Sequence, residues 1–287
     1  MPVAVVTGAN SGIGLATTLR LARDGHTVYA AMRDLDKAGD LRNACFAEGF
    51  ENVNLLRIEV TDDHSVDLAF EQVRTQSGPV DILVNNAGIS AGGAIEDTDI
   101  ETFERVMDTN YLGPIRCIRA VLPDMRARAS GTIVNVSSIG GRVFNPTMAA
   151  YNASKAALEA VSEVLAQEVA IYGIRVVVIE PGVVATPIFA KAEPHPPDTA
   201  YPMHYERNIA RFAKLLQSAT SPDAVAAVIA EALTTATPKF RWLVGPDAER
   251  AASARDRLSD EDYIGLSALD TTAWKRAWSD AFGTQLD

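Results

Sequence analysis

Cysteine is scarce in this chain of 287 residues, which contains only Cys45 and Cys117. Two cysteines cannot form a disulfide framework, and without further ligands they cannot form a zinc site. We therefore expect two reduced thiols in a cytoplasmic protein. No cluster of histidine, cysteine and acidic residues has the spacing of metal ligands, so we expect no metal site.

The sequence also lacks a surplus of basic residues. Its 26 Lys and Arg against 37 Asp and Glu give a formal net charge of −11. Binding to a phosphate backbone requires clustered cations, so we expect no nucleic-acid partner. Hydrophobic residues make up 47% of the chain and charged residues 22%, a balance typical of globular proteins.

Long hydrophobic runs are absent as well. No apolar stretch approaches the roughly 20 residues that a membrane-spanning helix needs, so we expect no membrane span. The first apolar run, Val3–Val6, is too short for a signal peptide and follows no basic segment, so we expect no secretory route.

Short β-branched runs alternate with helical patterns over about the first 185 residues. The strand-like runs are apolar throughout, which is typical of strands covered on both faces. They are Val3–Thr7, His26–Met32, Val53–Val60, Val80–Asn85, Gly131–Ser137 and Arg175–Glu180, with a last one at Phe240–Val244. Helical periodicity fills Gly12–Asp24, Ser65–Ser77, Asp99–Arg128, Tyr151–Tyr172, Tyr205–Gln217 and Pro222–Thr235.

This alternation predicts an α/β fold with a doubly wound parallel sheet of the Rossmann type, in three αβα layers. Ligands bind such a sheet at the carboxyl ends of its strands. We expect a single domain over residues 1–245, with a proline-rich substrate flap at about 187–222 laid across those strand ends. Residues 246–287 contain few apolar side chains, so we expect a polar C-terminal tail extension.

A glycine-rich turn, Thr7–Gly14, separates the first predicted strand from the first predicted helix. Gly8 permits a sharp turn, Gly12 lets the backbone approach a phosphate, and Gly14 lets the helix pack closely on the sheet. The helix N-terminus that follows, at Ile13, offers unpaired N–H groups to a pyrophosphate. A tight turn without a ligand is the alternative, but the position directly after the first strand favours dinucleotide binding.

Four polar residues form a second pattern. Tyr151 and Lys155 are four residues apart on a predicted helix and therefore share a face. A nearby ammonium favours the phenolate, so we expect Lys155 to lower the pKa of Tyr151. Ser138 follows a strand 13 residues before Tyr151, and Asn110 lies inside a helix, where asparagine is unfavourable without a specific hydrogen bond.

With these motifs the sequence resembles the short-chain dehydrogenase/reductase family in its single-domain form, over residues 3 to about 186. The resemblance implies hydride transfer between a nicotinamide cofactor and a carbonyl or secondary alcohol. It implies that Tyr151 is the acid and base, that Ser138 hydrogen-bonds the substrate oxygen and that Lys155 holds the nicotinamide ribose. It also implies that Asn110 positions a water molecule next to Lys155.

The same resemblance implies further cofactor contacts. Asn86-Ala87-Gly88 follows the fourth strand and matches a family motif beside the ribose, and Glu59-Val60 lies where the family contacts adenine. Pro181-Gly182-Val183-Val184-Ala185-Thr186 follows the sixth strand and matches the motif at the nicotinamide, with Val184 and Thr186 as the expected carboxamide contacts. Tyr151 and Lys155 complete the expected cofactor site.

The end of the second strand favours NADP(H), with NAD(H) as the alternative. Met32 stands where an acid would accept the ribose 2′-OH and repel a 2′-phosphate, and the guanidinium of Arg33 follows it. Asn10 and Ser11 would add hydrogen bonds to that phosphate. The alternative for Arg33 is a solvated cation paired with Asp34.

Apolar side chains near the strand ends favour a bulky hydrophobic ketone or alcohol as substrate, and the layout resembles the steroid- and retinol-active branch of the family. The expected lining consists of Ile139, Val143, Phe144, Phe189, Tyr201, Met203, Tyr205 and Phe212. Family members often pair through the two long helices, so we expect a homodimer or homotetramer. The competing hypothesis is a catalytically silent NADP(H)-binding sensor or scaffold, which would not need Ser138, Tyr151, Lys155 or Asn110.

Overall fold

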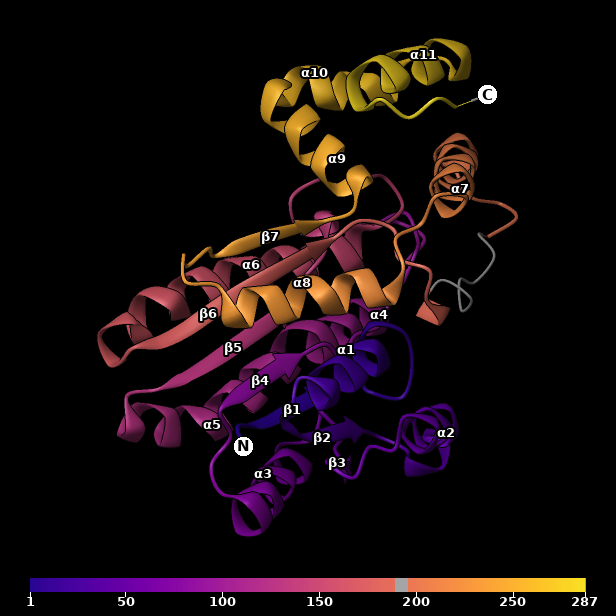
Figure 1. Ribbon diagram of the computed structural model, residues 1–287. Coiled ribbons are helices and arrows are strands. Elements are labelled where there is room, and N and C mark those ends of the chain that lie inside the picture. Colours follow the sequence, from indigo (N-terminus) through magenta and orange to yellow (C-terminus); the bar gives the residue numbers. More distant parts are fainter. Residues whose placement is uncertain (189–195, 287) are drawn as a thin grey trace.

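A computed structural model describes residues 1–188 and 196–286. Seven parallel strands form one sheet in the order β3-β2-β1-β4-β5-β6-β7 (Figure 1). Their bounds are β1 Val3–Thr7, β2 Thr27–Met32, β3 Val53–Arg57, β4 Ile82–Asn85, β5 Gly131–Val136, β6 Ile174–Pro181 and β7 Arg241–Val244. The chain reverses its direction of travel across the sheet between β3 and β4, so the predicted doubly wound α/β fold is confirmed.

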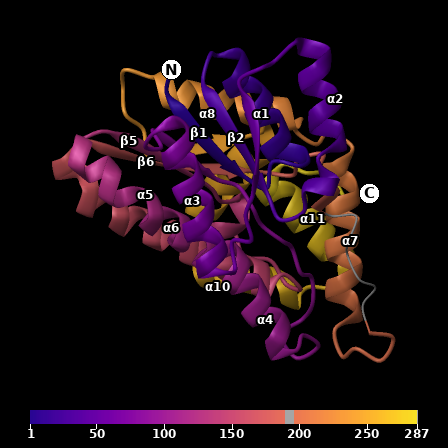
Figure 2. The same ribbon diagram turned by 90° about the horizontal axis from the view of Figure 1, so that it is seen from below.

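Helices cover both faces of the sheet (Figures 1 and 2). Buried side chains of α3 Asp63–Ser77, α5 Gly113–Arg128 and α6 Ala149–Val169 pack on one face. Those of α1 Gly12–Arg23, α2 Gly39–Glu48 and α8 Pro222–Thr234 pack on the other. Of the helices in the described part of the chain, none is both long enough and apolar enough to cross a membrane.

The uninterrupted apolar strands follow from this layering. Successive side chains of a strand point to opposite faces, so Val5 lies in the layer with α3 and α5, while Val6 lies in the layer with α1 and α8. Both residues are fully buried. Cys117 of α5 is buried in the first layer, and neither Cys117 nor Cys45 forms a disulfide, as expected.

The predicted helix over Asp99–Arg128 is divided in the structure. It consists of α4 Ile100–Met107, a five-residue π-helical turn at Asp108–Leu112 and α5. The wide turn contains Asn110, whose side chain bonds outside the helix. Helix α2 has no counterpart in the sequence analysis, because it buries only Leu41 and so has little apolar periodicity.

The C-terminal extension is not merely polar. It forms α9 Pro246–Arg257, α10 Asp260–Gly265 and α11 Thr271–Phe282, which stand beyond β7 and next to α7 Pro202–Leu216 (Figure 1). Trp274, Trp278 and Phe282, four residues apart, form one buried stripe of α11. This stripe packs with Val143 and Leu286 in a third apolar cluster that the sequence analysis missed.

Candidate active site

Three separate elements bring the four candidate catalytic residues together. Ser138 follows β5 by two residues, Tyr151 and Lys155 lie in the first two turns of α6, and Asn110 lies in the π-helical turn. A Cβ atom built on Gly88, just after β4, would lie 3.2 Å from Asn110 Oδ1 and 3.7 Å from Lys155 Nζ. The end of β4 therefore lies against both residues, at the carboxyl edge of the sheet.

Tyr151 is a protonated phenol in this arrangement. Burial raises the pKa of Tyr151 above its ordinary value, and a hydrogen bond with the Ser138 side chain acts in the opposite direction. The Ser138 hydroxyl also accepts a hydrogen bond from the Gly140 N–H at 3.0 Å. Ser138 is thereby fixed beside the phenol.

Lys155 does not lower the pKa of Tyr151 in the way expected from the sequence. Its Nζ lies 5.9 Å from the centre of the Tyr151 ring and donates to the Val136 carbonyl oxygen at 2.8 Å. Burial lowers the pKa of Lys155 to about 8, although the charge of Glu159 raises it. The pKa of Tyr151 therefore lies above its ordinary value in this structure, because burial outweighs the other influences on it, and the expected lowering by Lys155 is not seen.

Asn110 is fully buried, and its amide joins two parts of the site. Its Oδ1 accepts from the Ile89 N–H at 2.8 Å, and its Nδ2 donates to the Ile89 carbonyl at 2.9 Å. Nδ2 also donates to Ser154 Oγ at 3.0 Å. Asn110 therefore fixes the segment after β4 against α6, one residue from Lys155.

A charged network lies behind the catalytic helix. Glu159, one turn after Lys155, accepts from Arg241 Nε at 3.1 Å. Arg241 Nε also lies 3.3 Å from Glu180 at the end of β6, and Arg142 lies 3.3 Å from the other Glu180 oxygen. Burial and the charge of Glu159 raise the pKa of Glu180. The two buried carboxylates thus rely on two arginines for compensation.

The glycine-rich turn has the geometry of an anion-binding site. Gly12 has φ +53°, and a Cβ there would lie 2.9 Å from Thr186 Cγ2. A Cβ on Gly14 would lie 2.2 Å from the Gly8 carbonyl oxygen. Helix α1 has no acidic residue in its first turn, and its N-cap Ser11 makes no side-chain capping bond. The first N–H groups of α1, including those near Ile13, are therefore free for a phosphate.

The segment after β4 is tied directly to this turn. The Asn86 amide donates to the Thr7 and Gly8 carbonyls at 2.9 and 3.3 Å. The Asn86 and Ala87 N–H groups both donate to Thr7 Oγ1 at 3.0 Å. The side chain of Asn86 thus holds the ends of β1 and β4 together.

The motif at Pro181–Thr186 reaches the same edge of the sheet. Pro181 ends β6, and Gly182 N–H donates to the Val244 carbonyl at 3.0 Å. Val184 is buried and bridges to Thr220, whereas Thr186 approaches Gly12. The structure therefore brings the first and last of the predicted cofactor motifs into contact.

Arg33 and Glu59 lie side by side at the ends of β2 and β3. Arg33 Nε is 3.7 Å from Glu59 Oε2, and the Arg33 side chain is 74% exposed. Asp34 pairs with Lys37 instead, at 3.8 Å. Met32 is buried, so no acid occupies the last position of β2. The Val60 carbonyl oxygen accepts from Arg116 Nη1 at 3.3 Å.

A cleft with about 800 Å³ of space, partly open to solvent, adjoins Ser138 and Tyr151. Ile139, Val143 and Phe212 line it, as expected. The other expected residues, Phe144, Tyr201, Met203 and Tyr205, do not line it, and Phe189 lies outside the described residues. Tyr205 does not line the cleft because its hydroxyl donates to Asp97 and accepts from the Ala94 N–H. Tyr201 does not line it because its hydroxyl donates to Glu96.

Comparison with known proteins decides the family. The profile of the family described as short chain dehydrogenase matches residues 2–197, more than half of the chain. The chain belongs to the short-chain dehydrogenase family.

Relatives of this short-chain dehydrogenase match along most of its length. Oxidoreductase BOA17 of Botryotinia fuckeliana is 35% identical over 270 residues, covering 91% of this chain and 96% of that one. Estradiol 17-beta-dehydrogenase 1 of Rattus norvegicus is 35% identical, covering 84% and 72%. A crystal structure of a short-chain dehydrogenase from Streptomyces avermitilis superposes with a TM-score of 0.80 at 35% identity, covering 92% and 97%.

More than half of the residues that line the cleft of this short-chain dehydrogenase were not predicted from the sequence. Arg211 and Leu215 of α7 line it, as do Asp247 of α9 and Trp278 and Phe282 of α11. Asp247 accepts from the Val183 N–H at 2.7 Å, which fastens the extension to the strand edge. The spacing of four between Trp274, Trp278 and Phe282 was the signal available in the sequence.

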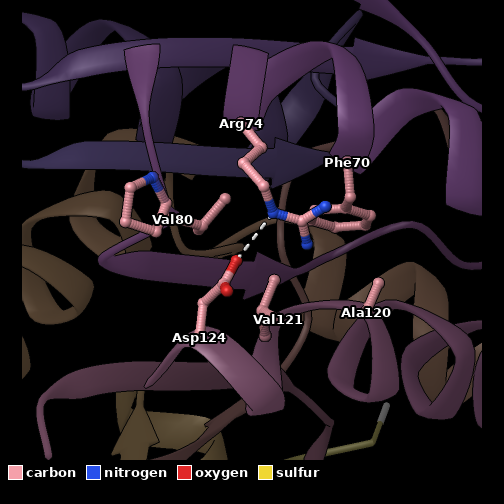
Figure 3. A pocket seen from close by; sticks show the side chains of 7 residues that line it. Phe70, Arg74, Val80, Ala120, Val121 and Asp124 are labelled. Atoms are coloured by element: carbon pink, nitrogen blue, oxygen red, sulfur yellow. Dashed lines mark hydrogen bonds and ion pairs between the residues drawn. The ribbon is translucent and has the colours of Figure 1, made fainter. Parts of the chain in front are cut away.

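A second, very small hollow of the short-chain dehydrogenase lies between α3 and α5 (Figure 3). There Arg74 Nε donates to Asp124 Oδ2 at 2.9 Å, and Phe70, Val80 and Val121 also line the hollow. None of the candidate catalytic residues lines it. The hollow is part of the packing between two helices, and we assign it no ligand.

Proposed function

We propose that this short-chain dehydrogenase is an NADP(H)-dependent carbonyl reductase or secondary alcohol dehydrogenase with Tyr151 as its acid and base. The observation that carries the proposal is the half-buried Tyr151, whose phenol is hydrogen-bonded with Ser138 on the wall of an otherwise largely apolar cleft. Its raised pKa keeps the phenol protonated at neutral pH, the state that a proton donor in carbonyl reduction requires.

The proposed reaction places the substrate oxygen between two hydroxyl groups. When bound, the nicotinamide cofactor supplies the hydride that attacks the carbonyl carbon. Ser138 donates a hydrogen bond to the oxygen as negative charge develops there, and Tyr151 transfers its proton to the same oxygen. In the oxidation direction, Tyr151 accepts the hydroxyl proton. The largely apolar lining of the cleft strengthens both interactions.

Lys155 and Asn110 support this proton transfer. Lys155 carries a charge below about pH 8, and we assign to it the nicotinamide ribose hydroxyls. Asn110 fixes the segment after β4 beside Lys155, and we assign to it the water through which protons are resupplied.

We assign the parts of the cofactor to the segments that meet at the carboxyl edge of the sheet. We assign the pyrophosphate to Gly8–Gly14, the ribose edge to Ala87 and Gly88, and the nicotinamide to Pro181–Thr186. The NADP(H) preference rests on the exposed Arg33 and on the buried Met32 in the place of an acid. Asn10 and Ser11 would add hydrogen bonds to the same phosphate, and Glu59 and Val60 would border the adenine.

A bulky hydrophobic carbonyl compound suits the cleft. Val143, Leu215, Trp278 and Phe282 supply most of its apolar surface. The relative from Rattus norvegicus is named as an estradiol dehydrogenase, in keeping with this proposal.

We also propose a homodimer or homotetramer that pairs through α4–α5 and α6. Val164 on α6 is an exposed apolar residue, in keeping with a covered helix face. Sedimentation of a monomer alone would contradict this assembly. We propose a cytoplasmic location in keeping with the two free thiols.

The proposed function is tested by NADPH oxidation with a panel of neutral hydrophobic ketones. We expect turnover with at least one of them and faster turnover with NADPH than with NADH. Tight binding of NADPH without turnover of any carbonyl or alcohol would instead support a cofactor-binding sensor.

A further inference from the structure

Arg211 is a buried cation in the wall of the substrate cleft. It is 7% exposed, and no carboxylate of the described residues lies within ion-pair distance of it. The hydrogen bond that it donates within that part of the chain runs from Nη2 to Asn208 Oδ1, at 2.7 Å. A guanidinium has five N–H donors, so most of its donors remain for a ligand in the cleft.

Asn208 holds this guanidinium in a fixed orientation. Its Nδ2 donates to Thr147 Oγ1 at 2.9 Å, which leaves its Oδ1 as the acceptor for Arg211. The guanidinium carbon lies 5.1 Å from the centre of the Phe212 ring and 5.3 Å from that of Trp278. These contacts fix the plane of the guanidinium, as a binding site for a planar ligand requires.

Arg207, one helical turn earlier, provides an internal comparison. It stacks on Trp274 at 5.1 Å, much as Arg211 stacks on Trp278. Arg207 donates to the carbonyl oxygens of Ser267 and Leu269, at 3.3 and 2.5 Å, and it does not line the cleft. Arg207 thus joins α7 to the C-terminal extension, whereas Arg211 lines the cleft with one hydrogen bond, to Asn208.

An unneutralised charge at this depth is costly. Burial lowers the pKa of Arg211 to about 10, which reports the loss of hydration around its charge. An anion that enters the cleft would restore the lost interaction, and a carboxylate matches the fork of a guanidinium with two parallel hydrogen bonds.

The remaining charges of the cleft favour a single carboxylate over a phosphate dianion. Arg211 is the only cation among the described lining residues. Asp247 is the only anion there, and its carboxylate already accepts from the Val183 N–H at 2.7 Å. A single cation with apolar surroundings therefore suits a ligand that has one negative charge and an apolar body.

We propose that Arg211 binds a carboxylate of the substrate, so that the enzyme reduces oxo acids with an apolar body. The carbonyl end lies at Ser138 and Tyr151, and the carboxylate end lies at Arg211 in the same cleft. This inference rests on the proposed function and adds the substrate class to it.

The test compares ω-benzoyl alkanoates of increasing chain length with their methyl esters, under NADPH. For the wild type we expect kcat/KM to be at least ~10-fold higher for the best acid than for its ester, because an ester cannot pair with a buried charge. In Arg211→Met we expect kcat/KM for the acid to fall about 30-fold, through a higher KM. We expect kcat/KM for the ester to change by less than about 3-fold. Equal losses for acid and ester would overturn the proposal.

Arg207→Met is the matched control, because it removes the other arginine stacked on a tryptophan of α11. We expect it to lower the melting temperature and to leave the acid-to-ester ratio of kcat/KM unchanged. A ratio that falls as much as in Arg211→Met would show that the preference comes from packing, and would overturn the proposal.

Binding to the wild type gives a readout that needs neither turnover nor a variant. In calorimetric titrations we expect ω-phenyl alkanoates to bind with a dissociation constant at least ~10-fold lower than that of the matching ω-phenyl alkanols. Equal affinity would overturn the role of Arg211 even if neutral ketones are reduced. Carboxylate binding without reduction of any carbonyl would overturn the proposed function and leave the anion site standing.

Discussion

Lys155 donates to the Val136 carbonyl oxygen at 2.8 Å, and its Nζ stands 5.9 Å from the centre of the Tyr151 ring. The lysine is therefore bonded to the backbone of β5 and not to the phenol. Burial favours the neutral form of both side chains: it raises the pKa of Tyr151 and lowers the pKa of Lys155 to about 8. In this arrangement the phenol keeps its proton, which suits reduction better than oxidation.

The direction of these pKa shifts predicts the pH dependence of the reaction. Reduction uses the protonated Tyr151, so its kcat/KM should be flat around neutral pH and fall above about pH 8, where Lys155 loses its charge. Oxidation uses the phenolate, so its rate should rise with pH. Initial rates in both directions from pH 6 to about 10 test this. A reduction rate that climbs steadily with pH would contradict the assignment.

Lys155 should destabilise the folded protein at neutral pH. Its folded pKa of about 8 lies below the ordinary 10.5, so below pH 8 the fold carries the full cost of a buried charge. Between pH 8 and 10.5 the unfolded chain binds more protons, and the free energy of unfolding therefore rises with pH. Lys155→Met should stabilise the fold at pH 7 by about 1–3 kcal/mol, even though activity is lost.

Urea denaturation at pH 7 and near pH 10 measures this effect. The gain of Lys155→Met over the wild type should shrink at the higher pH. Lys37→Met is the control, since Lys37 is largely exposed and its removal should change the free energy of unfolding by less than ~0.5 kcal/mol. A Lys155→Met protein that is less stable at pH 7 would show that the bond to Val136 outweighs the cost of burial.

The layered sheet and the family motifs were predictable because each depends on short-range patterns. Buried parallel strands are apolar throughout. The positions of Gly12, Tyr151 and Lys155 are set by their short separations in sequence from neighbouring residues of the same motif. The pKa of Tyr151 was not predictable from spacing, because it depends on how deeply the phenol is buried and on where Lys155 donates its hydrogen bond. Those features follow only from packing.

Gly14 should not tolerate even a methyl group. A Cβ there would lie 2.2 Å from the Gly8 carbonyl oxygen and 2.5 Å from the Asn86 amide nitrogen. Gly14→Ala should cost at least ~2 kcal/mol of stability and weaken NADPH binding at least ~10-fold, because the turn must shift. Thermal unfolding and NADPH titration measure both quantities.

Gly39→Ala is the control for that substitution. Gly39 opens α2, has no positive φ, and nothing lies within 4 Å of an added Cβ. It should leave NADPH binding unchanged and keep or slightly raise the stability. A Gly14→Ala protein that behaves like Gly39→Ala would mean that the turn does not depend on close backbone contact.

Arg33 should set the preference between the two nicotinamide cofactors. Arg33→Ala should weaken NADPH binding about 10-fold and leave NADH binding nearly unchanged, because only NADPH carries the 2′-phosphate. Arg42→Ala removes the same charge from the exposed face of α2 and should affect neither cofactor. Fluorescence titration of both variants with both cofactors decides the matter, and an unchanged preference in Arg33→Ala would remove Arg33 from the site.

The C-terminal extension shows where sequence patterns were insufficient. Trp274, Trp278 and Phe282 have helical spacing, but polar residues surround them, and nothing in the local pattern says what they cover. Their partners, Val143 and Arg211, are distant in sequence and meet them only in the folded chain. The shape of the substrate cleft therefore had to come from the structure.

The central claim is that the Tyr151 hydroxyl transfers a proton to the substrate oxygen, and Tyr151→Phe tests it most directly, because this variant removes one oxygen atom. In single-turnover measurements with NADPH and a reducible ketone, we expect NADPH affinity within about 3-fold of the wild type and a loss of at least ~1,000-fold in the rate of NADPH oxidation. A variant that binds NADPH normally and still oxidises it at a rate near that of the wild type would contradict the account.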